Sequence, residues 1–87
     1  MQTIVRVRGS SVPAATAGSI ANLLRAQGRV QVQAMGAAAV NQAMKAITVA
    51  RKFMQSEGSD LSIKPHFETV VEGGAELTLT ALEVTKE

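Results

Sequence analysis

The chain of 87 residues has the length of one domain, and its 46% of hydrophobic residues are enough to build a single core. It contains no cysteine, which excludes disulfide bonds and thiolate metal sites and makes a reducing cytoplasm the expected compartment. It also lacks Trp and Tyr, so most of the aromatic platforms that stack single-stranded nucleic acids are absent. Any contact with nucleic acid should therefore be mainly electrostatic.

Charge is distributed unevenly along the chain, although the net value is only +2. Residues 1–56 contain seven Lys or Arg and no acid, whereas residues 57–87 contain seven Asp or Glu and two Lys. Such asymmetry indicates a basic surface for a polyanion, or complementary poles that join subunits. It is equally compatible with a small domain that has no charged partner, because sequence halves need not be spatial halves.

No segment has the pattern of a targeting or membrane sequence. The first nine residues, MQTIVRVRG, alternate in polarity instead of forming the apolar run of a signal peptide. No apolar run is long enough for a transmembrane helix. We therefore expect a cytoplasmic protein that does not enter a membrane.

Two short segments alternate in polarity, as half-buried strands do. In residues 2–8, QTIVRVR, the valines would face the core and Arg6 and Arg8 the solvent. In residues 29–35, RVQVQAM, the valines point one way and the two glutamines the other. Both segments predict strands with one apolar face and one polar face.

Two helices are predicted from apolar spacing and end signals. The first follows GSSVP, in which Ser11 can cap a helix and Pro13 suits its first turn, and it should run to about Gln27 before Gly28. The second, about residues 37–55, is apolar over more than one narrow stripe. It therefore needs cover on two sides, from its own sheet and from either the first helix or a second subunit.

The carboxy-terminal third predicts a hairpin. LSIKPHFETVV and ELTLTALEV read as strands joined by EGGA, and Pro65 should place the first of them at a sheet edge. The order is then β-α-β-α-β-β in one domain, residues 1–87. Right-handed crossovers would place both helices on one face of a four-stranded mixed sheet, giving an α/β (α+β) two-layer sandwich. The other face should be bare and polar, formed by Arg6, Arg8, Gln31, Gln33, Ser62, Lys64, His66, Thr78 and Thr80.

No group of residues has the spacing of a catalytic or metal site. His66 and Glu68 would share one side of an edge strand, which is more typical of a solvated pair than of an acid–base dyad. Without cysteine, a metal would depend on one histidine and scattered carboxylates. The turn GSSVP could offer free N–H groups to a phosphate, but an ordinary helix start is the simpler interpretation. We expect no enzyme activity, no cofactor, no metal and no small-molecule substrate.

The second helix carries one polar stripe. Asn41, Lys45, Thr48 and Lys52 are separated by four, three and four residues, so they share a helix face. Asn41 and Gln42 could bind a partner helix or tie the helix start to the neighbouring loop. The lysines could bind phosphates or simply solvate the exposed side.

The segment QAMGAAAVNQAMKAITVARKF resembles the signature of the stage V sporulation protein S family, in which Gln-Ala leads through Gly-Ala to a helix bearing Asn-Gln-Ala-x-Lys-Ala and then Ala-Arg. SSVPAATAGSIANLLR is similar to the family's upstream pattern. The resemblance implies an Alba-like fold, shared in outline with the carboxy-terminal domain of translation initiation factor three. It also implies a role in sporulation control and binding of DNA or RNA as a dimer. Alba proteins use a basic loop and a basic hairpin arm, whereas here the loop carries hydroxyls beside Arg8 and the hairpin, ETVVEGGAE, is acidic.

The leading hypothesis is a non-enzymatic regulator that binds DNA or RNA through backbone phosphates as a homodimer or higher homo-oligomer. The alternative is a protein-interaction or self-assembling module of developmental control, in which basic and acidic parts pair without nucleic acid. The candidate nucleic-acid contacts are Arg6, Arg8, Ser10, Ser11, Arg25, Lys45, Arg51 and Lys52. The candidate subunit-interface residues are Ala39, Asn41, Gln42, Ala46, Val49 and Phe53.

Overall fold

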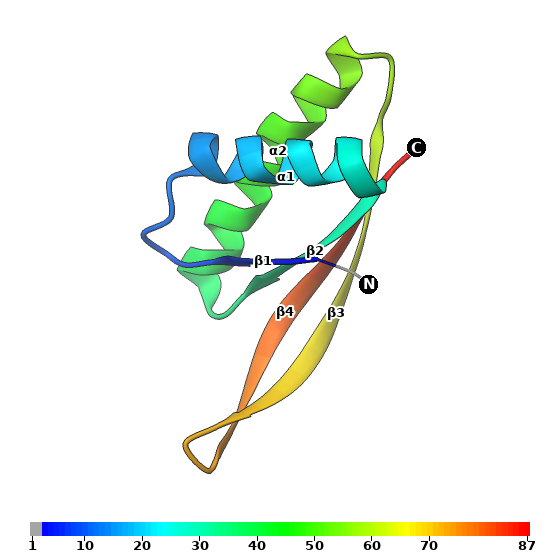
Figure 1. The fold of residues 1–87 in the computed structure, drawn as a ribbon. Coiled ribbons are helices and arrows are strands. Elements are labelled where there is room, and N and C mark those ends of the chain that lie inside the picture. Colours follow the sequence, from blue (N-terminus) through cyan, green and yellow to red (C-terminus); the bar gives the residue numbers. More distant parts are fainter. Residues whose placement is uncertain (1–2) are drawn as a thin grey trace.

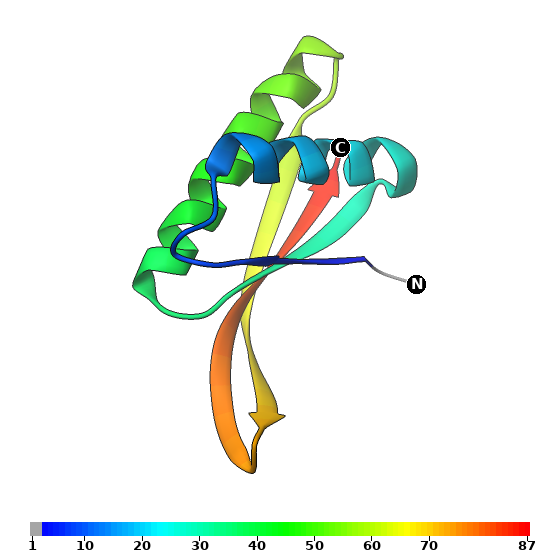
Figure 2. The same cartoon turned by 60° about the vertical axis from the view of Figure 1, so that its left-hand side comes forward.

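The computed structural model describes residues 3–87, so Gln2 of the first predicted strand lies outside the described residues. The elements are β1 (Ile4–Val7), α1 (Pro13–Gln27), β2 (Arg29–Ala34), α2 (Ala37–Ser56), β3 (Leu61–Glu72) and β4 (Ala75–Lys86) (Figure 1). The strands form one mixed sheet in the order β1-β2-β4-β3, in which β1 and β2 are parallel and the other pairs antiparallel. Both helices lie on one face (Figures 1 and 2), so the predicted two-layer fold is confirmed.

The core lies between the helix layer and the sheet. Its largest side chains come from all the central elements: Ile20 and Leu24 of α1, Val30 and Val32 of β2, Ile47 and Met54 of α2, and Val84 of β4, each at most 2% exposed. The two helices also pack against each other. A row of buried alanines on α2, which includes Ala43 and Ala50, permits this close approach. The first helix therefore covers part of the second apolar side of α2, while Val49 and Phe53 on that side stay partly exposed.

The β1–α1 turn is closed by Ser11 in a way that the sequence did not predict. The N-cap residue of α1 is Val12, and no side chain caps the helix. Instead, the Ser11 hydroxyl accepts a hydrogen bond of 2.9 Å from the backbone N–H of Arg8. Pro13 does occupy the first helical turn, and Gly28 ends the helix at φ +79°, both as predicted.

The β3–β4 hairpin is longer than the rest of the sheet. Strand β4 pairs with β2 only as far as Thr80, which lies opposite Ala34, while β3 and β4 continue to pair to their turn. Residues 68–79, here called the arm, therefore project beyond the body of the protein (Figures 1 and 2). Strand β3 is the outer strand, which confirms the edge position predicted from Pro65.

The predicted polar face is wrong at two positions on β4. Pairing is continuous, without a bulge, so alternate residues keep to one face along the whole strand. Leu82 and Val84 belong to the core, which places Thr78 and Thr80 on the helix side as well. Leu79 instead shares the opposite face with Glu83. The apolar residues of β4 thus change sides between Leu79 and Leu82, because the helices cover only the second half of the strand.

Candidate nucleic-acid interface

Within residues 3–87, both helices lie on one face of the sheet, so its other face has no second layer, as predicted. The centre of that face is a hydrogen-bonded network of its own polar side chains. Gln31 and Gln33 of β2 are only 6% exposed. Gln31 Nε2 donates to Glu83 Oε2 and to Glu68 Oε1, while Gln33 Nε2 donates to Gln31 Oε1 and to Glu68 Oε2. Glu68 belongs to β3 and reaches across β4 because the intervening residue on that face is the small Ala81.

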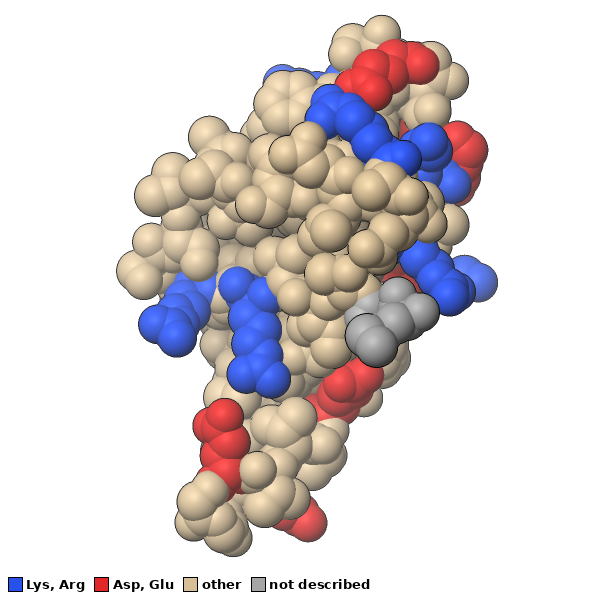
Figure 3. Space-filling view, viewed as in Figure 1, with Lys and Arg blue, Asp and Glu red and all other residues tan. Residues whose placement is uncertain are grey.

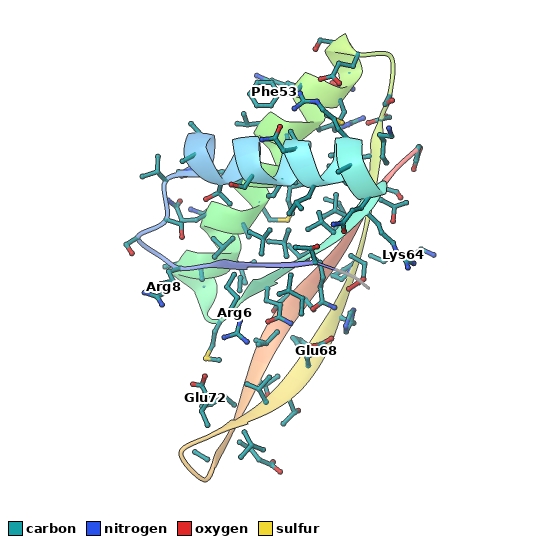
Figure 4. The ribbon with its side chains drawn as sticks, in the orientation of Figure 1. Arg6, Arg8, Phe53, Lys64, Glu68 and Glu72 are labelled. Atoms are coloured by element: carbon teal, nitrogen blue, oxygen red, sulfur yellow. The ribbon has the colours of Figure 1, made fainter. Side chains whose placement is uncertain are left out.

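A groove lies where the arm leaves the body, beside the ends of β1 and β2. It has a volume of about 290 Å³. Arg6 and Arg8 flank it from the body, and Glu72 lies toward the arm (Figure 4). Figure 3 shows basic side chains on the lower part of the body and acidic ones on the projecting hairpin. The lining residues are Arg6, Val7, Arg8, Gln33, Ala34, Met35, Val70, Val71, Glu72 and Leu79.

Arg6 and Arg8 differ from two other candidate phosphate-binding arginines. Both have exposed side chains, and neither guanidinium makes a hydrogen bond or ion pair with any residue of 3–87. Arg25, in contrast, forms a bidentate pair with Glu57, with a shortest N–O distance of 2.6 Å. Of the four candidate arginines, the two without a carboxylate partner therefore lie at the groove.

Arg51 is also neutralised, by Asp60, with an Nε–Oδ1 distance of 2.6 Å. The Arg51 hydrogen bond and the backbone N–H of Leu61 together lower the pKa of Asp60 to about 2. The hydrogen bond from Arg25 likewise lowers the pKa of Glu57, and the partners raise the pKa values of both arginines. These two cations are less available to phosphate than Arg6 and Arg8 because each already has a carboxylate partner.

The polar stripe on α2 is exposed as its spacing predicts, with Lys45 and Lys52 both open to solvent. It lies on the helix layer, away from the groove face. Ser10 is exposed in the β1–α1 turn, where Gln42 Nε2 donates to the Ser11 carbonyl at 2.9 Å. Of the two alternatives for Gln42, the tie between helix and loop is therefore the one that forms.

The candidate interface residues on α2 are not all available to a partner. Ala39 and Ala46 are at most 4% exposed within the single chain, because they pack in its own core. Val49 is half-buried, Asn41 is exposed and Phe53 is 41% exposed (Figure 4). A docking surface on this helix would therefore involve Asn41, Val49 and Phe53 rather than the alanines.

The groove's apolar wall and Glu72 were not singled out from the sequence. Alternation places Met35, Val70 and Leu79 in strands, but it does not show that the arm and the end of β2 line one groove. The available signal was the change of apolar phase in ELTLTALEV, where Leu79 and Leu82 cannot face the same side of one regular strand.

His66 lies on the network side, with Nε2 at 3.1 Å from Glu68 Oε1. Within residues 3–87, no three His, Asp or Glu side chains gather in a way that could hold a metal ion. The helices of the described chain are also too short or too polar to cross a membrane.

A known structure and a known family resemble this chain. The structure is similar to that of Alba from Thermoplasma volcanium, with a TM-score of 0.63 and 14% sequence identity over 98% of this chain and 99% of the other. At that identity the likeness establishes an Alba-like fold. The family model of stage V sporulation protein S matches residues 3–87. The chain therefore belongs to the stage V sporulation protein S family.

Proposed function

We propose that the protein is a small, non-enzymatic regulator of sporulation or development that binds DNA or RNA through backbone phosphates in the cytoplasm. Family membership supports the regulatory role. The main support for nucleic-acid binding is that the guanidinium groups of Arg6 and Arg8 lie at the groove without a carboxylate partner. Guanidinium groups match phosphate oxygens with two parallel hydrogen bonds, so this pair offers the strongest phosphate contacts on the body.

The arm contributes less to this binding than the body. Its exposed charges in residues 68–79 are the carboxylates Glu72 and Glu76, which repel phosphate. The nucleic acid should therefore approach from the side of Arg6 and Arg8. Lys45 and Lys52 provide a second, weaker contact on α2, reached by a long strand or by the other subunit of a dimer.

The proposal includes a dimer formed through α2. Phe53 is a large apolar side chain exposed at the end of that helix, and Val49 lies one turn before it. Burial of the exposed part of Phe53 favours association, and Asn41 can supply a polar contact at the edge. Phe53→Ser should shift a dimer toward monomer in analytical ultracentrifugation, while an unchanged sedimentation coefficient would place the interface elsewhere.

A salt series tests nucleic-acid binding. Nuclease-treated protein is titrated against labelled double-stranded DNA and single-stranded RNA by fluorescence anisotropy, from low to high salt. The logarithm of the association constant should fall linearly with the logarithm of salt concentration, by about 0.9 per neutralised phosphate of duplex DNA or about 0.7 per phosphate of a single strand. Arg6→Ala combined with Arg8→Ala should flatten that slope, and Lys45→Ala should flatten it less.

Arg25→Ala combined with Arg51→Ala is the matched control, because it also removes two exposed guanidinium groups but from residues already paired with Glu57 and Asp60. Equal loss in the control would show that net charge, not the groove, determines affinity. Absence of binding at low salt would reject nucleic-acid binding. In that case, assembly that depends on protein concentration and dissolves in salt would favour the alternative module, since the acidic arm and basic body could pair between copies.

A further inference from the structure

The polar network on the sheet ends at an acceptor without a donor. Gln33 is 6% exposed, and its Oε1 has no hydrogen-bond partner in residues 3–87. Exchanging the oxygen and nitrogen of this amide does not solve the problem, because the neighbours of Nε2 are Gln31 Oε1 and a carboxylate of Glu68. Both neighbours only accept, so the amide orientation is fixed and Oε1 needs a donor from elsewhere.

The groove is the place from which such a donor can come. Gln33 is one of its lining residues, together with Met35 and Leu79. Arg6 is the register partner of Gln33 on β1, and its guanidinium extends to solvent without donating to the amide. A molecule seated in the groove would therefore meet the Gln33 side chain and two cations at the rim. Gln33 Oε1 itself is covered, so a donor from the groove reaches it only when a neighbouring lining side chain, such as the exposed Met35, moves aside.

We propose that the groove binds one unpaired nucleotide of a single-stranded nucleic acid. Its phosphate binds Arg6 and Arg8, its base lies against Met35 and Leu79, and a base N–H donates to Gln33 Oε1. This inference rests on the proposed function and deepens it, because it names a single strand rather than a duplex as the ligand.

The charges around the groove give the ligand one orientation. Arg6 and Arg8 attract the phosphate to the body side, whereas Glu72 repels it from the arm side. The base, which is neutral and carries N–H donors, is left for the apolar wall that Met35 and Leu79 form beside Gln33. Each natural base has at least one amino or imino N–H on its pairing edge, so the acceptor favours a base without selecting one sequence.

The size of the groove favours one unpaired base over a duplex. At about 290 Å³ it lies just below the range of about 300–1,000 Å³ that is typical of small-molecule sites. In a duplex, the donors of the pairing edge are already used and the bases are stacked, whereas single strands can turn a base outward. The groove walls are aliphatic, so a base stacks on them less strongly than on an aromatic ring. The base is nevertheless in contact with the protein.

The experiment compares two labelled ten-nucleotide RNA strands that carry the same number of phosphates, one with all its bases and one fully abasic. A backbone binder holds both equally, whereas a base-accepting groove should bind the abasic strand about five- to tenfold more weakly, which is the lower part of the range for one base stacked on an aromatic side chain. Equal affinity with a normal salt slope would overturn the nucleotide groove and leave the proposed function intact. No binding of either strand would overturn both.

Two variants locate the base contact. Gln33→Leu removes the acceptor without changing charge and should abolish the difference between the two strands while the salt slope stays the same. Gln55→Leu makes the same chemical change on the exposed end of α2 and should preserve the difference. Because Gln33 is buried in a network, Met35→Ser provides a second test at a position that is 44% exposed. If Gln33→Leu and Met35→Ser both keep the full difference, as the control does, the base binds elsewhere and the proposal is wrong.

A free nucleotide would present the same chemistry as one unit of a strand. Adenosine monophosphate is therefore titrated against the protein and followed through the NMR signals of the Gln33 side-chain amide. Weak binding at millimolar concentration together with tight strand binding identifies the strand as the ligand. Tight binding of the mononucleotide without strand binding would overturn the single-strand proposal in favour of a free-nucleotide site.

Discussion

The two halves of β4 belong to different regions of the molecule. In the body, Leu82 and Val84 point toward the helices and are at most 3% exposed. In the arm, no helix is present, and the most buried apolar residue, Leu79, points to the opposite face and lines the groove. One regular strand thus serves a core at one end and a candidate binding site at the other, because its apolar residues change face where the helix layer stops.

Because of this difference, we expect substitutions in the body to change stability and substitutions in the arm to change local order or binding. Residues of the body exclude water between two layers, so their truncation should weaken the whole fold. Residues of the arm contact few neighbours, so their changes should alter local order or ligand affinity. Each substitution proposed below has a control substitution, either in the other region or elsewhere in the same region.

The largest effect is expected in the core. Leu24→Ala should lower the free energy of unfolding by about 2–5 kcal/mol, because Leu24 is fully buried and leaves a cavity. Phe67→Ala, beside the arm, should cost less than about 0.5 kcal/mol, since Phe67 is 79% exposed. Urea unfolding measures both. A loss from Phe67→Ala as large as that from Leu24→Ala would mean that Phe67 is buried in solution, for example by a second subunit.

The fold of the body could be predicted from the sequence because its signals are local. Apolar periodicity located the helices and strands, Gly28 located a helix end, and Pro65 placed β3 at the edge. The exposed stripe on α2 followed from the same periodicity, as did the exposure of Arg6 and Arg8. These features depend on residues a few positions apart, or on a single residue with a restricted backbone.

The candidate site was harder to predict because its contacts join distant segments. Gln31 and Glu68 are 37 residues apart in the chain, and Arg25 and Glu57 are 32 apart. Alternation could not show that Gln31 would be buried by carboxylates, nor that Arg25 would be neutralised. The face of Thr80 was misassigned for the same reason, since it is set by which half of β4 the helices cover.

A smaller effect is expected at the turn of the arm. Gly74 has φ +80° with open space around it, so Gly74→Ala costs about 1 kcal/mol through backbone strain alone. Amide hydrogen exchange should show faster exchange in the arm, while the slowest amides of β2 keep their rates. Gly18→Ala, inside α1 and with no neighbour for the new methyl group, should leave the arm unchanged. Equal acceleration in the arm and in β2 would show that the two regions open together.

A change of charge in the groove should raise affinity modestly. Glu72→Gln removes the carboxylate that shares the groove with Arg6 and Arg8, so binding of a single-stranded RNA should tighten by about two- to fivefold at low salt. Glu76→Gln makes the same change in the arm outside the groove lining and should have a smaller effect. Anisotropy titrations at two salt concentrations test both. If the two variants behave alike, only the overall charge of the arm matters.

The smallest effect concerns the ion pair between Arg51 and Asp60 at the end of the body away from the arm. Since the pKa of Asp60 falls from 3.8 to about 2 on folding, its ionised form favours the folded state above pH 4. That contribution is lost as pH falls from about 4 through about 2, where the carboxylate becomes protonated. Asp60→Asn should therefore lower Tm slightly near neutral pH and make the acid decline in Tm shallower.

Both groups of this pair are exposed, so solvent screening keeps the effect small, and differential scanning calorimetry across the acid range is the appropriate measurement. Glu76→Gln is the matched control, because that carboxylate has no hydrogen bond or ion pair with the rest of residues 3–87. Its acid profile should follow the parent protein. If Asp60→Asn also follows the parent profile, the pair does not link folding to pH, and the pair of Arg25 with Glu57, whose pKa is also lowered, becomes the group to change next.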